Sequence, residues 1–90
     1  MSQTSPTTPR RHTLPPYRVL LHHDDENPML YVVRNIVALT PLSLRESAAK
    51  MLEANKIGLT LLLTTHQERA ELYVQQFASR NLTVTIEPAM

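Results

Sequence analysis

The sequence has 90 residues and contains no cysteine, no tryptophan and a single glycine. Because cysteine is absent, disulfide bonds and thiolate chemistry are excluded. One glycine cannot supply the glycine-rich loops that surround phosphate groups in nucleotide-binding proteins. The formal net charge is +1, so the composition gives no electrostatic reason to expect nucleic acid or an anionic membrane as a partner.

Long apolar runs are also missing. No stretch approaches the ~18 apolar residues of a membrane-spanning helix, and the N-terminus lacks the apolar core of a signal peptide. The hydrophobic fraction of 42% is nevertheless enough for a core, which must be mostly aliphatic because aromatic residues make up only 4%. We therefore expect one small cytoplasmic domain that does not associate with membranes.

Residues 1–16 differ in composition from the rest. They contain four of the seven prolines, several Ser and Thr, and almost nothing apolar. Such a segment cannot bury enough surface to offset its loss of conformational entropy. We predict a disordered Pro/Thr-rich extension over residues 1–16 and a folded domain over residues 17–90. The alternative is that Arg10 and Arg11 make the extension a docking arm.

Hydrophobic periodicity predicts three strands: Tyr17–His22, Leu59–Thr64 and Leu82–Glu87. In the first strand, Tyr17, Val19 and Leu21 share one face.

The same periodicity predicts three helices between the strands. The first has Asn27 as its N-cap and Pro28 at its first position, and it ends at Thr40-Pro41; its apolar positions are Met29, Val32, Val33, Ile36, Val37 and Leu39. The second opens with a capping box of Ser43 and Glu46, presents Leu44, Ala48, Met51 and Leu52 on one face, and stops at Gly58. The third opens with a second capping box of Thr65 and Glu68, and its core face carries Ala70, Tyr73 or Val74, and Phe77.

The order β-α-α-β-α-β predicts an α/β (α+β) two-layer sandwich with the helices on one face of the sheet.

The segment HHDDENPM, residues 22–29, concentrates polar groups between the first strand and the first helix. His22, His23, Asp24 and Asp25 are metal-ligand types, but neighbouring strand residues point to opposite faces and no HExxH pair is present. We therefore expect no metal and no cofactor; the alternative is a metal-binding protein that uses His22, His23 and Asp24. Asp24 and Asp25 are suited in principle to acid–base catalysis, yet adjacent acids in a polar loop are ordinarily solvated, so no enzymatic activity is expected.

Binding remains. Acceptors and a carboxylate beside an apolar wall suit a cation with an apolar attachment, such as the α-amino group of a peptide whose first residue is hydrophobic. The alternative is that Asp24 and Asp25 only stabilise the helix N-terminus.

The stretch YRVLLHHDDENPMLYVV, residues 17–33, resembles the opening of the ClpS family: an apolar strand, Asn-Asp-Asp, then Thr-Pro-Met and a helix. The likeness continues through AAKMLEANKIG, residues 48–58, THQERAEL and TVTIEP, so it covers about residues 17–88 of what looks like a divergent member. It implies a three-stranded antiparallel sheet covered by three helices. It also implies an N-end rule adaptor that binds bulky hydrophobic N-terminal residues and delivers substrates to a ClpA- or ClpC-type AAA+ unfoldase. The alternative is a ClpS-like module that docks an unfoldase or another protein without reading N-terminal residues.

The resemblance also implies roles for individual residues. The α-amino group of the peptide would meet His23, Asp24 and Asn55. The first side chain would enter a pocket lined by Asn27, Pro28, Met29, Val32, Met51, Ala54 and Leu82. Glu68 falls where the family contacts the unfoldase, and Tyr73 where that surface usually carries a lysine.

Four substitutions distinguish this chain from the family pattern. His23 stands where the family has asparagine, and Asn55 stands where it has a histidine, as if the pair were exchanged. Ala54 replaces a usual valine, which predicts a wider pocket, and Asn27 replaces threonine. The preferred first residue, the unfoldase and the oligomeric state stay open.

If neutral His23 accepts a hydrogen bond from the peptide ammonium, affinity should fall as the pH drops through about 6.5, the unperturbed histidine pKa. Titration of a Leu-initiated peptide between about pH 5.5 and 8 measures this, and unchanged binding at acid pH would contradict an acceptor role for His23.

Overall fold

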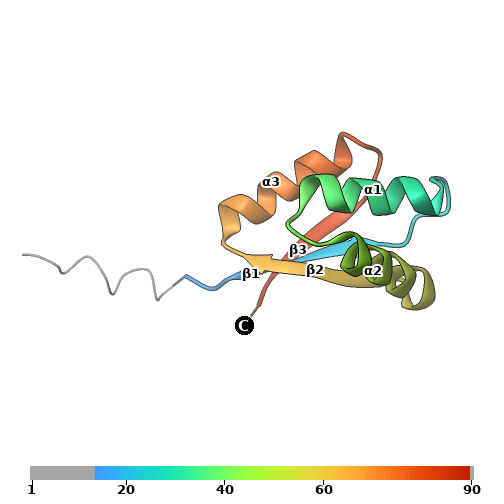
Figure 1. The fold of residues 1–90 in the computed structure, drawn as a ribbon. Coiled ribbons are helices and arrows are strands. Elements are labelled where there is room, and N and C mark those ends of the chain that lie inside the picture. The colour runs from blue at the N-terminus through green and yellow to red at the C-terminus, as the bar shows by residue number, and fades with distance from the viewer. Residues whose placement is uncertain (1–13, 90) are drawn as a thin grey trace, which may run out of the picture.

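The computed structural model describes residues 14–89 and has the element order β-α-α-β-α-β (Figure 1). The elements are β1 (Tyr17–His22), α1 (Met29–Leu39), α2 (Leu44–Ile57), β2 (Leu59–Thr65), α3 (Gln67–Ala78) and β3 (Val84–Pro88). The predicted order and the α+β class are confirmed. The predicted extension lies, apart from residues 14–16, outside the described residues, as does residue 90.

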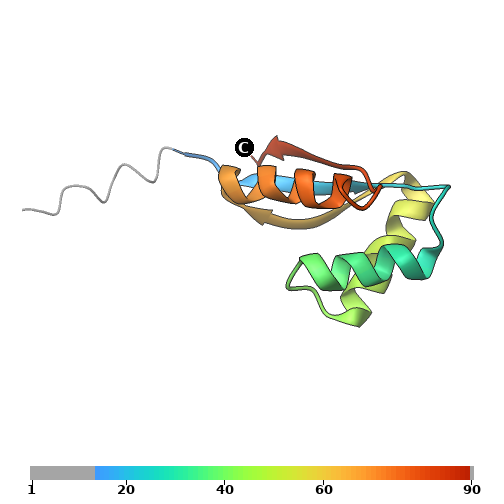
Figure 2. The same cartoon turned by 90° about the horizontal axis from the view of Figure 1, so that it is seen from above.

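The three strands form one antiparallel sheet in the order β2-β1-β3, so that β1 is central (Figure 2). Val19 and Leu21 of β1 are fully buried on the helix-facing side, as the alternation predicts. The register between β1 and β2 slips by one residue: Val19 pairs with Leu63 and Leu20 with Leu61. Leu62 is therefore an extra residue on β2, which is the definition of a β-bulge.

The helices cover one face of the sheet. In Figure 2, α3 lies along the sheet, and the α1–α2 pair lies to one side, where α2 contacts β2. Helix α1 packs against both α2 and α3. A polar chain joins α1 to the end of α3: the Tyr31 hydroxyl donates to the Arg80 carbonyl (2.9 Å), and the Arg80 guanidinium donates to Asn35 Oδ1 (2.7 Å).

The second helix begins and ends as predicted. The Ser43 hydroxyl accepts from the Glu46 backbone N–H, and the Glu46 carboxylate accepts from the Ser43 N–H, which completes the capping box. Gly58 ends the helix with φ of 100°, a left-handed conformation that side chains other than glycine adopt only with strain.

The predicted starts of the other two helices are wrong. Pro28, rather than Asn27, is the N-cap of α1, and His66, rather than Thr65, is the N-cap of α3; neither makes a side-chain capping bond. Thr65 belongs instead to β2, where it pairs with Tyr17. Asn27 turns its side chain away from the helix, as described below.

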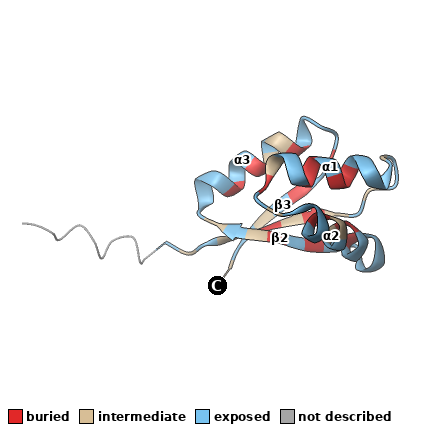
Figure 3. Ribbon diagram, in the orientation of Figure 1, coloured by how far each residue is buried: buried red, intermediate tan, exposed pale blue. Residues whose placement is uncertain are grey.

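The buried stripe of α2 also differs from the prediction. Leu44 and Leu52 are exposed, whereas Ser47, Met51 and Ala54 are buried (Figure 3). The helix therefore meets the rest of the fold largely through small side chains. On α1, Val32, Val33 and Ile36 are buried as predicted, but Met29 and Val37 are exposed.

Ser47 is fully buried (0% exposed), and its hydroxyl has no hydrogen-bond partner. An unpaired buried hydroxyl destabilises a fold, and alanine is the better helix former. We expect Ser47→Ala to raise the free energy of unfolding by about 0.5–1.5 kcal/mol in urea denaturation.

The matched control is Ser43→Ala, one turn earlier in the same helix. It removes the N-cap and should lower stability by about 0.5–2 kcal/mol. A loss of stability in Ser47→Ala comparable to that in Ser43→Ala would show that the Ser47 hydroxyl does find a partner.

Candidate functional site

A hollow lies where the end of β1, the following loop, the start of α1 and the second half of α2 meet. Its lining residues are Leu21, His22, His23, Asp24, Asn27, Met29, Val32, Met51, Ala54 and Asn55. Polar groups from the loop and Asn55 stand beside aliphatic and thioether side chains. The space open to the centre of a water molecule is about 10 Å³, which is room for about one water.

Asp24 shapes the loop. Its Oδ1 accepts from the backbone N–H of Glu26 (2.7 Å) and of Asn27 (3.2 Å), and its Oδ2 accepts from the Asn27 side chain. Partial burial acts to raise the pKa of Asp24, but these hydrogen bonds, together with the nearby His23, outweigh it, so the pKa of Asp24 is lowered. The carboxylate is therefore ionised at neutral pH.

Asn27 ties the loop to a distant turn. Besides donating to Asp24, its amide donates to the Asn81 carbonyl at 3.1 Å. Asn81 adopts a left-handed conformation with φ of 64° between α3 and β3. The residue that the sequence suggested as a helix cap thus connects two loops 54 positions apart.

His23, Asn55 and Asp24 form the polar, solvent-facing part of the lining, which is the mouth of the hollow. The Nδ1 of His23 lies 2.7 Å from Asn55 Oδ1, and its Nε2 lies 2.6 Å from Asp25 Oδ1. Both hydrogen bonds, followed by the negative charges of Asp25 and Asp24, raise the pKa of His23 above its ordinary value of 6.5. Only the imidazolium has two N–H donors, so the protonated ring satisfies both oxygens at once.

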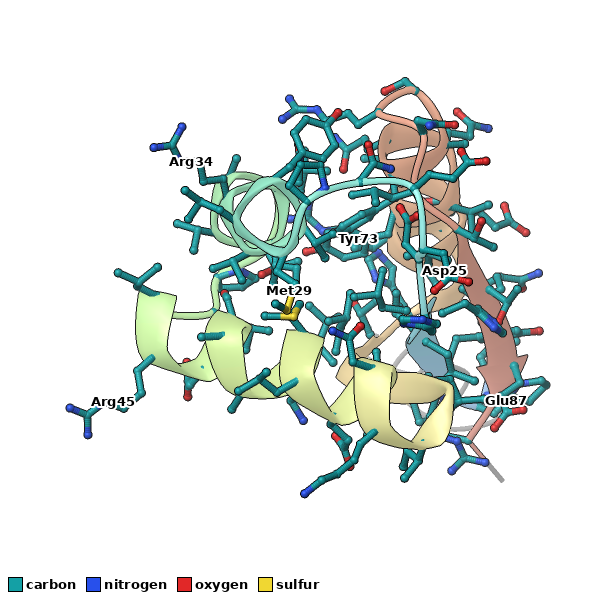
Figure 4. All side chains as sticks on the ribbon, turned by 90° about the vertical axis from the view of Figure 1, so that its right-hand side faces the viewer. Asp25, Met29, Arg34, Arg45, Tyr73 and Glu87 are labelled. Atoms are coloured by element: carbon teal, nitrogen blue, oxygen red, sulfur yellow. The ribbon has the colours of Figure 1, made fainter. Side chains whose placement is uncertain are left out.

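Methionines border the apolar part. Figure 4 shows Met29 directed from α1 toward α2, whereas Arg34 and Arg45 extend away from the body of the protein. Met29 is 55% exposed, and Met51 on α2 is buried. The Asn55 amide also donates to the Met51 sulfur at 3.5 Å, so the Asn55 oxygen faces His23.

Most of the residues that the sequence pointed to come together here. His23, Asp24 and Asn55 meet at the mouth, and the lining includes five of the expected pocket residues: Asn27, Met29, Val32, Met51 and Ala54. Pro28 and Leu82 do not line the hollow; Leu82 is buried in the core instead. Leu21 and His22 line it and were missed, although their place at the end of β1, directly before the loop, was the signal for them.

The side chains of the adjacent residues His22 and His23 contact different parts of the fold. His22 Nε2 lies 2.7 Å from Thr85 Oγ1 on β3, while His23 faces Asn55 on α2. Within residues 14–89, no three His, Asp or Glu side chains gather in a way that could hold a metal ion. None of the helices in this part of the chain is both long and apolar enough to span a bilayer.

The comparison with protein families decides the identity. The family model described as ATP-dependent Clp protease adaptor protein ClpS matches residues 12–85. The chain belongs to the ClpS family. Curated ClpS adapters from Synechococcus elongatus and Gloeobacter violaceus are 42% and 39% identical over 87 and 80 residues, covering 96% and 88% of this chain and 92% and 86% of theirs.

A solved ClpS structure shows the same fold. It is that of Agrobacterium tumefaciens ClpS2 bound to L-phenylalaninamide, with a TM-score of 0.76, 22% identity, and coverage of 82% of this chain and 96% of the other. The family assignment makes this ClpS protein an adaptor of the Clp protease.

The family surface that the resemblance placed on α3 is only partly as expected. Glu68 is exposed on the first turn of α3. Tyr73 is only 5% exposed and points into the fold in Figure 4, with the Arg69 guanidinium 6.0 Å from its ring centre. Tyr73 is therefore a core residue, which agrees with one of the two alternatives that the periodicity gave for this face of the helix, and the surface position that the resemblance implied for it is wrong.

The lowered pKa of Asp24 predicts a pH-dependent contribution to stability. A carboxyl group with a lowered folded-state pKa stabilises the fold above its unfolded value of about 3.9 and loses that contribution as the pH falls through the folded value. Asp24→Asn replaces one acceptor with a donor that faces other donors. We expect it to lower the free energy of unfolding by about 0.5–1.5 kcal/mol at neutral pH and by clearly less in acid.

Urea denaturation at neutral and strongly acid pH measures this difference. Glu26→Gln is the matched control, since it removes one negative charge from the same loop but none of the hydrogen bonds to Asp24. Equal losses for Asp24→Asn at both pH values would contradict a role for the ionised carboxylate.

Proposed function

We propose that this ClpS protein binds the bulky hydrophobic N-terminal residue of substrate proteins and delivers those substrates to a ClpA- or ClpC-type AAA+ unfoldase. The observation that carries the proposal is the meeting of Asp24, Asn55 and His23 at the mouth of a hollow with an apolar wall. A free peptide N-terminus has the complementary chemistry: an ammonium group beside a side chain.

Asp24 can receive the ammonium without releasing the loop. An ionised carboxylate offers about four acceptor positions, and three are occupied by Glu26 and Asn27. The remaining position and the Asn55 oxygen would hold the α-amino group. Hydrogen bonds that involve charged groups contribute about 1.5–3 kcal/mol each, so losing the peptide's charge should be costly.

The first side chain would lie between Met29, Met51 and Ala54. The hollow has room for about one water as it stands, so these walls must move to admit a leucine or phenylalanine. Methionine is suited to this because it is unbranched and fills irregular space in several rotamers. Burying such a side chain would contribute about 1.5–3 kcal/mol.

The solved relative supports the ligand class. L-Phenylalaninamide, bound by Agrobacterium tumefaciens ClpS2, combines a free α-amine with a benzyl side chain and no further residues. We assign the same class to this chain, with His23 and Asn55 as the mouth residues and with Glu68, on the exposed start of α3, as the proposed contact for the unfoldase.

The narrow hollow also supports a second candidate: a ClpS-like module that docks an unfoldase or another protein without reading N-terminal residues. The two candidates differ in one property. Only the first requires a free α-amine on the peptide.

The decisive experiment compares fluorescent peptides that differ in their first residue, each with the α-amine free or acetylated. We expect binding of free-amine peptides that begin with Leu, Phe, Tyr or Trp, and at least about 10-fold weaker binding after acetylation, because a charge-assisted hydrogen bond is lost.

Two controls sharpen the comparison. Asn55→Ala should weaken the free-amine peptides and leave the weak acetylated ones unchanged, whereas Gln76→Ala on α3 should alter neither. Equal affinity for free and acetylated peptides, or no binding to any of them, would favour the second candidate.

A further inference from the structure

We propose that the His23 side chain is a built-in competitor for the ligand's ammonium group: it occupies the Asn55 oxygen and must leave before a peptide amine can bind there. This inference rests on the proposed function and assigns His23 a role opposite to that of an acceptor. The inference concerns ligand specificity, because a ligand must then bind the Asn55 oxygen more favourably than the His23 ring does.

The contacts of the imidazole support an occupied site. Asn55 Oδ1 lies 2.7 Å from His23 Nδ1, a short distance for a nitrogen–oxygen hydrogen bond. The Asn55 amide nitrogen is directed at the Met51 sulfur, so the oxygen is the atom of this amide that faces His23. A peptide ammonium and the His23 ring N–H would therefore approach the same oxygen from the same mouth.

The main chain around His23 lets the ring leave without unfolding the site. The His23 backbone N–H donates to the Gly58 carbonyl at 2.9 Å, which holds the residue beside the end of α2. The second ring contact is with Asp25, whose side chain is 88% exposed. A bond to so exposed a carboxylate is weakened by water, so rotation of the side chain breaks one firm contact and one weak contact while Asp24 keeps the loop in place.

The charges around the ring favour its protonated form. From its own loop, Asp24 and Asp25 act on it as negative charges. From α2 it meets the uncharged Asn55, and the neighbouring acid, Glu53, accepts a hydrogen bond from Thr60. Lys56 lies with Asn55 on the outer side of α2. From the sheet, His22 is directed to Thr85.

This arrangement changes the pH window expected from the sequence. The pKa of His23 is raised above 6.5 by its bonds to Asn55 and Asp25, so the competing imidazolium persists above that pH. Affinity should rise as the pH increases through the raised value and fall again once the peptide's α-amine, with a pKa of about 7.7–8.0, loses its proton.

The test uses the full chain and a Leu-initiated peptide with a free amine, titrated from acid to mildly alkaline pH. His23→Ala removes the competitor, and His23→Asn replaces the titrating ring with an amide that stays uncharged at every pH. We expect both variants to bind about 2–10-fold more tightly than the wild type at acid pH, the equivalent of one net hydrogen bond, and to lose the rise of affinity on the acid side. His66→Asn is the matched control and should change neither property.

A second readout does not depend on affinity. Binding equilibria are reciprocal, so saturating peptide should lower the pKa of His23, followed by NMR of the imidazole. The same pKa should fall in Asn55→Ala without any peptide, since its largest cause is removed.

The outcomes separate the inference from the function it rests on. Weaker binding by His23→Ala, or an unchanged or raised His23 pKa in the complex, would overturn the competitor role while leaving N-terminal recognition in place. No binding of any free-amine peptide by the wild type or either His23 variant would overturn the proposed function itself.

Discussion

The central position of β1 is the constraint on which the rest of the structure depends. Because β1 pairs on both sides, its alternation decides which face receives the helices, and Val19 and Leu21 anchor that face. The end of β1 also decides where the polar loop emerges: beside the end of α2, where the His23 backbone meets the Gly58 carbonyl. Asp24 then gives the loop a fixed shape. The position of the candidate site therefore follows from the pairing of β1 in the sheet.

Local sequence patterns predicted the fold correctly where a residue type favours one backbone conformation or one local contact. Gly58 ends a helix because few other residues adopt its backbone angles, and the Ser43 capping box is a local contact within one turn. The predictions that Asn27 and Thr65 begin helices were wrong because a polar side chain can cap a helix or form hydrogen bonds with another part of the fold equally well. Leu52 misled because hydrophobicity marks residues that are suited to burial, whereas the packing of neighbouring elements decides which ones are buried.

Most of the residues that line the hollow could be predicted from the resemblance, but the contacts among them could not. The resemblance brought His23 and Asn55 to one place, but their hydrogen bond joins residues 32 positions apart and no local pattern encodes it. The network of Tyr31, Asn35 and Arg80 was missed for the same reason. An exchange that conserves residue types need not conserve chemistry, because on the loop the imidazole gains an acidic neighbour, Asp25, within hydrogen-bonding distance.

The bulge at Leu62 affects how readily another polypeptide chain can add a strand to the sheet. β2 is an apolar strand at the edge of the sheet, and such an edge is a template on which another chain can add a strand. One extra residue interrupts the even spacing of the free N–H and C=O groups and increases the local twist. An incoming strand could therefore stay in register over only a few residues. This adaptor of the Clp protease thus carries, in its own backbone, a barrier to forming a shared sheet with another chain.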